Sequence, residues 1–159
     1  MRIAKKASGK KSVTYPEALE VALCYGWIDG LKRTESETTW LQRFTPRRAR
    51  SLWSKINREK ALALIESGKM KSAGLQEIER AKKNGCWDSA YASPSSATMM
   101  PELEIALAKS PRAKAFFETL TRANRYAILW RVQTAKKAET REKRVRSFIE
   151  MLEKGETFH

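Results

Sequence analysis

The residues whose types and spacing best suit contact with a partner lie in one basic segment, between positions 43 and 60. This segment holds seven arginines and lysines against the single acidic residue Glu59, a net charge of +6. Six of the seven make up the candidate anion-binding set: Arg43, Arg47, Arg48, Arg50, Lys55 and Arg58. Phe44 and Trp53 are interleaved with them, and arginines beside aromatic rings suit phosphate contact combined with base stacking. The pattern favours an anionic partner such as nucleic acid. A solvated basic face with Trp53 in the core is the alternative.

Thr45 and Pro46 support anion binding in a second way. A capping residue followed by proline is typical of a helix start, so we expect a short helix from Pro46 to about Trp53. The first backbone N–H groups of such a helix favour anions. The next helix should begin at Ser54 or Asn57 and end at Gly68.

A second candidate site is a pocket centred on one carboxylate. Its residues are Trp27, Asp29, Ser51, Trp53 and Asn57. In this hypothesis Asp29 is the acid/base group, Arg47 clamps an anion, and Ser51 or Asn57 supplies hydrogen bonds. In the alternative, Asp29 is structural and pairs with Lys32 or Arg47. Because no second acid, metal set or activated nucleophile accompanies Asp29, we assign no catalytic residue and expect a binding protein rather than an enzyme.

The composition narrows the classes of function. The chain has 159 residues and a net charge of +14, which favours an anionic partner but says nothing of fold. The only histidine is His159, so histidine-based catalysis and Cys/His zinc sites are not expected. The two cysteines, Cys24 and Cys86, show no CxxC spacing, and we expect them to be buried thiols. We predict no metal and no cofactor.

The expected cellular location is inferred from the pattern of apolar residues. The basic N-terminal stretch is not followed by the apolar run of a secretory signal, and no window approaches 18 apolar residues. We expect a cytoplasmic chain without membrane insertion. The sequence predicts no particular oligomeric state.

The elements that position these residues are predicted from capping and periodicity. A short edge strand is expected near 2–6. Thr14, Pro16 and Glu17 predict a helix start with a capping box, and that helix should run over 15–25. Alternating aromatic and β-branched residues then predict a hairpin formed by 27–32 and 39–44.

The rest of the chain is predicted to be helical. After a helix capped by Ser72 and ended by Gly85, the small polar residues of 88–100 are typical of a linker. The predicted C-terminal helices are 101–108, 111–120, 123–132 and 138–154. The fold class is α+β, mostly helical, with a small antiparallel sheet or hairpin near the N-terminus followed by a helical bundle. We interpret 1–159 as one domain with a mixed part (1–87), a linker (88–100) and a helical part (101–159).

Several motifs resemble one known family. The N-terminal ones are YPEALE at 15–20, ALCYGWIDG at 22–30, RFTPR at 43–47 and SLWSKIN at 51–57. Together with GKM at 68–70 and AKKAETREKR at 135–144, they are similar to the YdeI/OmpD-associated family, also called bacteriocin-protection proteins. The resemblance covers essentially the whole chain. It implies a bacterial cytosolic-type domain linked by name to bacteriocin tolerance and to an outer-membrane porin, and it brings no catalytic residue or cofactor.

Three hypotheses for function follow. The first is a non-enzymatic, stress-tolerance type of binding protein that uses the basic segment for nucleic acid or another anionic partner. The second is a small-molecule-binding protein or enzyme with a pocket around Asp29, Arg47 and Asn57. The third is a protein-interaction module, for which a large exposed apolar patch on the C-terminal helices would be the sign.

Overall fold

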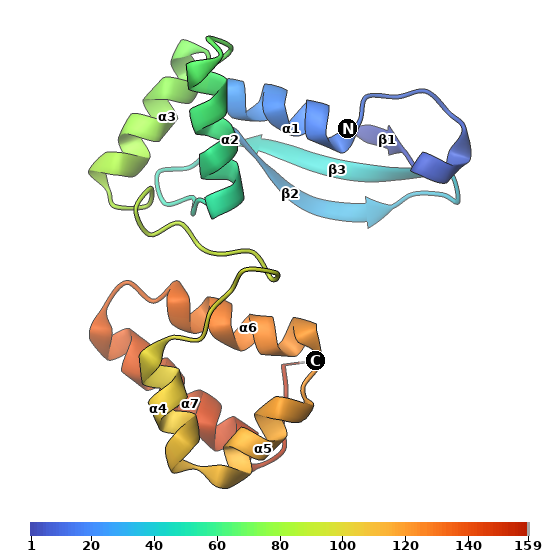
Figure 1. Ribbon diagram of the computed structural model, residues 1–159. Coiled ribbons are helices and arrows are strands. Elements are labelled where there is room, and N and C mark those ends of the chain that lie inside the picture. The colour runs from blue at the N-terminus through green and yellow to red at the C-terminus, as the bar shows by residue number, and fades with distance from the viewer. Residues whose placement is uncertain (159) are drawn as a thin grey trace. The chain divides into compact units, whose positions relative to one another are not determined.

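The computed structural model describes residues 1–158, and His159 lies outside the described residues. The chain divides into two compact units, an N-terminal unit of Met1–Ala90 and a C-terminal unit that begins at Tyr91. The N-terminal unit holds a three-stranded sheet with helices, and the C-terminal unit is helical (Figure 1). The predicted α+β class, with a small antiparallel sheet near the N-terminus followed by helices, is confirmed.

The sheet of the N-terminal unit is antiparallel throughout. It consists of β1 (Arg2–Ala4), β2 (Trp27–Thr34) and β3 (Thr39–Pro46), in the order β1-β3-β2. The predicted edge strand and hairpin are therefore confirmed, although β2 and β3 are both longer than expected. A short 3-10 helix, Lys6–Ser8, follows β1.

Helix α1 (Tyr15–Cys24) covers one face of the sheet. The predicted capping box is present, with Thr14 and Glu17 exchanging side-chain and backbone hydrogen bonds. The Tyr15 ring lies 6.0 Å from Trp40 and 6.4 Å from Phe44, both on β3. Side chains alternate between faces along a strand, so Arg43 and Thr45 lie on the opposite face from Phe44 and α1.

Gly26 joins α1 to β2 at a close approach. Its φ of +73° is in the left-handed region, and an added Cβ would lie 2.6 Å from Cγ of Glu77. The tight turn lets β2 begin at Trp27, directly after the helix.

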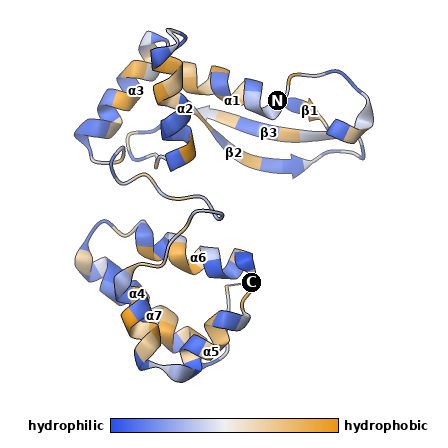
Figure 2. Ribbon diagram, in the orientation of Figure 1, coloured by the Kyte–Doolittle hydropathy of each residue, from blue (hydrophilic) through white to orange (hydrophobic). Residues whose placement is uncertain are grey.

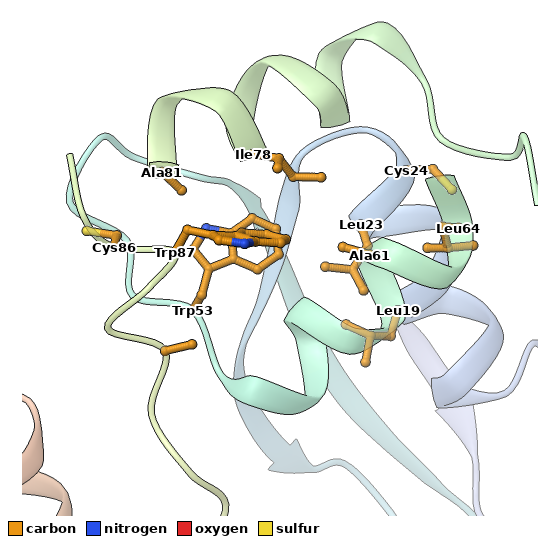
Figure 3. Close-up of a cluster of buried hydrophobic side chains, with 11 residues drawn as sticks. Leu19, Leu23, Cys24, Trp53, Ala61, Leu64, Ile78, Ala81, Cys86 and Trp87 are labelled. Carbon is orange, nitrogen blue, oxygen red and sulfur yellow. The ribbon is translucent and has the colours of Figure 1, made fainter. Parts of the chain in front are cut away.

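The core of the N-terminal unit gathers around two tryptophans. The rings of Trp53 and Trp87 pack edge to face, with 4.9 Å between their centres. Figure 3 shows them among residues of α1, of α2 (Lys55–Glu66) and of α3 (Ser72–Lys83). Trp53 is only 2% exposed, which agrees with the alternative that placed it in the core.

Two predictions about helix starts are wrong. No helix forms over 46–53, because β3 continues to Pro46, which pairs with Trp27, and the Arg47 N–H then donates to the Gly26 carbonyl at 3.0 Å. The strand has these partners because β2 starts immediately after Gly26. Ser72 is the first residue of α3 and not its cap, since Lys71 occupies the N-cap position without a side-chain capping bond, whereas Ser54 caps α2 as expected.

The C-terminal unit contains four helices among its described residues. They are α4 (Pro101–Lys109), α5 (Pro111–Thr119), α6 (Arg122–Gln133) and α7 (Ala138–Glu153), close to the predicted ranges. Hydrophobic and hydrophilic residues interleave along them (Figure 2), and the hydrophobic ones form a second core that includes Leu103, Ile128 and Leu152. Within residues 1–158, no helix has both the length and the apolar composition that a membrane crossing requires.

Candidate anion-binding site

Part of the basic segment surrounds a hollow on the N-terminal unit. This basic hollow has a volume of about 570 Å³ and is lined by Gly30, Leu31, Arg43, Thr45, Pro46, Arg47, Arg48 and Ser51. Three of the six candidate anion-binding arginines and lysines thus come together here, with Ser51 from the candidate pocket. The lining contains no carboxylate.

A β-bulge shapes one wall of the basic hollow. Asp29 pairs with Phe44 and Lys32 pairs with Gln42, so Gly30 and Leu31 together lie opposite Arg43. The Gln42 side chain, 3% exposed, donates to the carbonyl oxygens of Gly30 at 2.9 Å and of Arg43 at 3.1 Å. Gln42 therefore fixes the bulge from beneath.

The other wall is the turn that follows β3. The Arg48 N–H donates to Oγ of Ser51 at 2.9 Å, and the Ser51 N–H donates back to the Arg48 carbonyl at 2.9 Å. The Arg43 and Arg48 side chains are exposed and form no ion pair or hydrogen bond with any other residue in 1–158. Both guanidinium groups thus keep all their donors for solvent or a ligand.

Arg47 differs from its neighbours because it is 5% exposed. Its guanidinium lies 3.5 Å from the centre of the Trp53 ring and donates to the Leu52 carbonyl at 3.1 Å. Stacking of a guanidinium on an indole face is favourable. Arg47 therefore links the wall of the basic hollow to the tryptophan core.

The remaining three basic candidates do not line this hollow. Arg50 and Lys55 are exposed elsewhere in the turn and at the start of α2. Arg58 donates to the Trp87 carbonyl at 3.2 Å, a contact that supports the fold of the N-terminal unit. The two aromatic candidates also differ from the stacking hypothesis, because Trp53 is buried and Phe44 packs against Tyr15 on the far face of the sheet.

The residues of the candidate pocket around Asp29 lie in several different environments. Asp29 accepts a hydrogen bond from the Tyr15 hydroxyl at 2.9 Å and a long one from Nδ2 of Asn57 at 3.5 Å. Lys32, one of the partners expected for Asp29, instead lies 4.4 Å from the Trp40 ring centre. Asp29 faces α1 because it pairs with Phe44, and it therefore ties the hairpin to α1 and α2.

An apolar hollow of about 350 Å³ contains the fifth pocket candidate, Trp27. It is lined by Met1, Ala18, Val21, Ala22, Tyr25, Trp27 and Phe44. This surface was not predicted from the sequence, although Val21 on α1 and Tyr25 at its C-cap are spaced i, i+4. Most of the exposed large apolar residues lie on this N-terminal unit, whereas the C-terminal helices expose Ile105.

The cysteines are buried away from the basic hollow lining. Cys24 and Cys86 are both buried, and burial raises the pKa of the Cys24 thiol, with nearby Lys71 acting against it. Such a thiol is protonated at neutral pH. Among residues 1–158, no group of three or more histidine, cysteine or acidic side chains is arranged to hold a metal ion.

The helices α4–α7 lie in a region that matches a known family model. Residues 96–155 match the family model described as "Bacteriocin-protection, YdeI or OmpD-Associated". Over this part, the chain is similar to the YdeI/OmpD-associated family. The resemblance drawn from the sequence motifs is confirmed over this region.

The basic hollow lies outside the YdeI/OmpD-associated region. Residues 1–77 match a different model, described as "Domain of unknown function (DUF8412)". The assignment of 1–159 to one domain of the YdeI/OmpD-associated type stays a prediction. No curated protein and no solved structure matches the chain.

Proposed function

We propose that this chain is a binding protein whose N-terminal unit holds an anionic partner at the basic hollow. The observation that carries the proposal is the convergence of Arg43, Arg47 and Arg48 on one hollow without a lining carboxylate. Two of these arginines have no ion pair within residues 1–158. The exposed Arg33 lies on the same open face of the sheet as Arg43 and extends the positive surface.

The arrangement favours phosphate groups as the part of the partner that is recognised. Guanidinium groups match the geometry of phosphate oxygens, and the hydroxyl groups of Thr45 and Ser51 line the same hollow. No aromatic side chain lines it, since Trp53 is buried and Phe44 faces α1. We therefore propose contact with a nucleic-acid backbone, largely independent of base sequence, rather than base stacking.

A comparison of two matched double variants tests the proposal. In R43Q/R48Q both exposed arginines of the basic hollow lose their charge. In R112Q/R122Q the charge is removed from two exposed arginines of the C-terminal unit, whose side chains form no hydrogen bond or ion pair with another residue in 1–158. Binding of a labelled single-stranded oligonucleotide is measured by fluorescence anisotropy from about 50 to about 200 mM salt.

We expect R43Q/R48Q to bind roughly tenfold more weakly and to lower the salt slope by about 1 to 2, because each backbone contact contributes about one unit. We expect R112Q/R122Q to bind within about threefold of wild type. Equal losses in the two variants would show that net charge alone drives binding and would overturn the site. Arg47 is left intact because its contact with Trp53 makes it part of the core.

The pocket hypothesis has weaker support. Asp29 already accepts hydrogen bonds from Tyr15 and Asn57, and Arg47 is held by the Trp53 ring and the Leu52 carbonyl. The two side chains thus have structural contacts of their own. We propose no reaction for this chain.

A further inference from the structure

The C-terminal unit carries a groove of opposite character, between α4 and α7. These helices lie side by side (Figure 1) and enclose a hollow of about 710 Å³. From α4 it is lined by residues spaced i, i+3, i+4 and i+7, namely Glu102, Ile105, Ala106 and Lys109. A matching stripe on α7 runs from Glu142 to Glu153. We call this surface the α4–α7 groove.

The floor of the α4–α7 groove is apolar. Ala106, Val145 and Ile149 belong to the C-terminal core or pack against it. Ile105 stands beside them and is 56% exposed, unlike the other large apolar side chains of residues 91–158. A helix with an apolar stripe can cover such a floor, because two parallel ridges of side chains form the walls.

The rim of the α4–α7 groove is acidic, although the C-terminal unit as a whole is basic. Four of the eight acidic residues in 91–159 line the groove, compared with two of the thirteen basic ones. The acidic four are Glu102, Glu142, Glu150 and Glu153. Negative charge is thus concentrated along this one surface.

The rim carboxylates differ in how far the fold already uses them. Arg141 donates to Glu102 at 2.7 Å, and the Ser110 hydroxyl donates to Glu153 at 2.6 Å, which leaves the charge of Glu153 uncompensated. Glu142 and Glu150 are exposed, and their carboxylates form no hydrogen bond or ion pair with another residue in 1–158. The two groove cations, Lys109 and Arg146, only partly balance this charge.

We propose that the α4–α7 groove docks a cationic amphipathic helix of a partner protein. The partner's apolar stripe covers Ile105, Val145 and Ile149. Its lysines or arginines, flanking that stripe, lie against Glu142, Glu150 and Glu153. Charge complementarity selects this occupant, since an acidic or neutral helix would leave the rim carboxylates unpaired.

The test uses a synthetic helical peptide with leucines at i, i+3, i+4 and i+7 and lysines on both flanks, labelled for fluorescence anisotropy. The full chain is titrated into it. Three variants are compared with wild type: E142Q/E150Q, I105S, and the control E104Q/E118Q, whose two exposed glutamates do not line the groove. All four substituted glutamates and Ile105 are surface residues, so circular dichroism should show the fold retained.

We expect wild type and E104Q/E118Q to bind the peptide equally. We expect E142Q/E150Q to bind roughly five- to tenfold more weakly, and I105S roughly threefold more weakly. R43Q/R48Q should bind like wild type, because neither arginine lines the α4–α7 groove. Equal binding by E142Q/E150Q and E104Q/E118Q would overturn the proposal.

A second copy of the chain is the competing occupant. Sedimentation velocity of the chain alone distinguishes it. We expect the same sedimentation coefficient at all concentrations for wild type and I105S. Self-association of wild type that I105S abolishes would show that the groove holds another copy of this chain, and would overturn the peptide-partner proposal.

Discussion

The basic hollow and the α4–α7 groove place charge in opposite ways. Both units are basic, with nineteen Lys/Arg against ten Asp/Glu in 1–90, a net charge of +9, and thirteen against eight in 91–159, a net charge of +5. Yet three arginines and no carboxylate line the basic hollow, whereas four glutamates line the groove. The net charge of the C-terminal unit therefore does not predict the acidic rim of the groove. The fold sorts residues of both signs onto separate faces, and a partner is selected by the face it meets.

The largest expected loss of stability comes from removing Trp53, the core tryptophan on which Arg47 stacks. Trp53→Ala should cost ~3–5 kcal/mol of unfolding free energy in the N-terminal unit, because it leaves a cavity beside Trp87 and removes the ring under Arg47. Anion binding should be lost with it. Chemical denaturation and oligonucleotide titration of the same variant measure both.

The same variant tests whether the two surfaces are independent. The α4–α7 groove lies wholly within the C-terminal unit. Cationic-peptide binding by Trp53→Ala should therefore match that of wild type. Loss of peptide binding together with anion binding would show that the groove depends on the N-terminal unit.

A smaller effect is expected from Gln42→Leu, which keeps the side-chain volume but removes both donors to the bulge. The carbonyl groups of Gly30 and Arg43 then lose their partner, at a cost of about 1–3 kcal/mol. Because the bulge positions Arg43, we expect anion binding about threefold weaker at a temperature where the variant is folded. Unchanged binding would show that the position of Arg43 does not matter for anion binding.

Asp29→Asn should have a smaller effect on both stability and anion binding. Asparagine retains an oxygen that accepts from the Tyr15 hydroxyl, so thermal unfolding should report a loss of about 1 kcal/mol or less. Removal of one negative charge near the sheet should leave anion binding equal or slightly stronger. Clearly weaker oligonucleotide binding by this variant would instead favour the pocket around Asp29.

The smallest expected effects are losses of stability at acid pH, which arise from one ion pair in each unit. Hydrogen bonds from Arg2 and Thr39 lower the pKa of Glu35 to about 2, and a hydrogen bond from Arg141 lowers the pKa of Glu102. Since both folded pKa values lie below the unfolded ones, each carboxylate stabilises its unit above the ordinary glutamate pKa of about 4.3. As the pH falls below that value, each contribution is lost, and for Glu35 the loss extends down to about pH 2.

Denaturation of wild type, E35Q and E102Q over this range measures the two contributions. Wild type should lose stability on acidification more steeply than either variant. Parallel curves for all three would show that these pairs do not contribute, as is common for exposed pairs.

Local signals in the sequence predicted most of the elements. Thr14 and Glu17 fixed the start of α1, Ser54 that of α2, and Pro101 and Pro111 lie in the first turns of α4 and α5. These signals act within one turn of the chain, so no tertiary information is needed.

The end of β3 depended instead on a partner strand. Thr45 and Pro46 have the form of a helix start, but pairing with Ile28 and Trp27 keeps them extended. The competing helix signal is weaker than a ladder already formed along the rest of the strand. The same pairing created the bulge and gave Gln42 its role, neither of which periodicity shows.

The burial of individual charges was also beyond the sequence. Arg47 and Arg48 are adjacent and chemically identical, yet Arg47 is 5% exposed and stacked on Trp53 while Arg48 is exposed. The α4–α7 groove required two helices separated by almost thirty residues to pack together. Their ranges were predicted, but their contact was not.

The most direct test of the basic hollow is a two-dimensional NMR titration of ¹⁵N-labelled chain with a short single-stranded oligonucleotide. Saturating shifts should appear at Gly30, Leu31, Arg43, Arg48 and Ser51, with the C-terminal helices unchanged apart from weak, salt-sensitive shifts. Shifts spread evenly over the exposed arginines and lysines of both units, or centred on Asp29 and Asn57, would contradict the account.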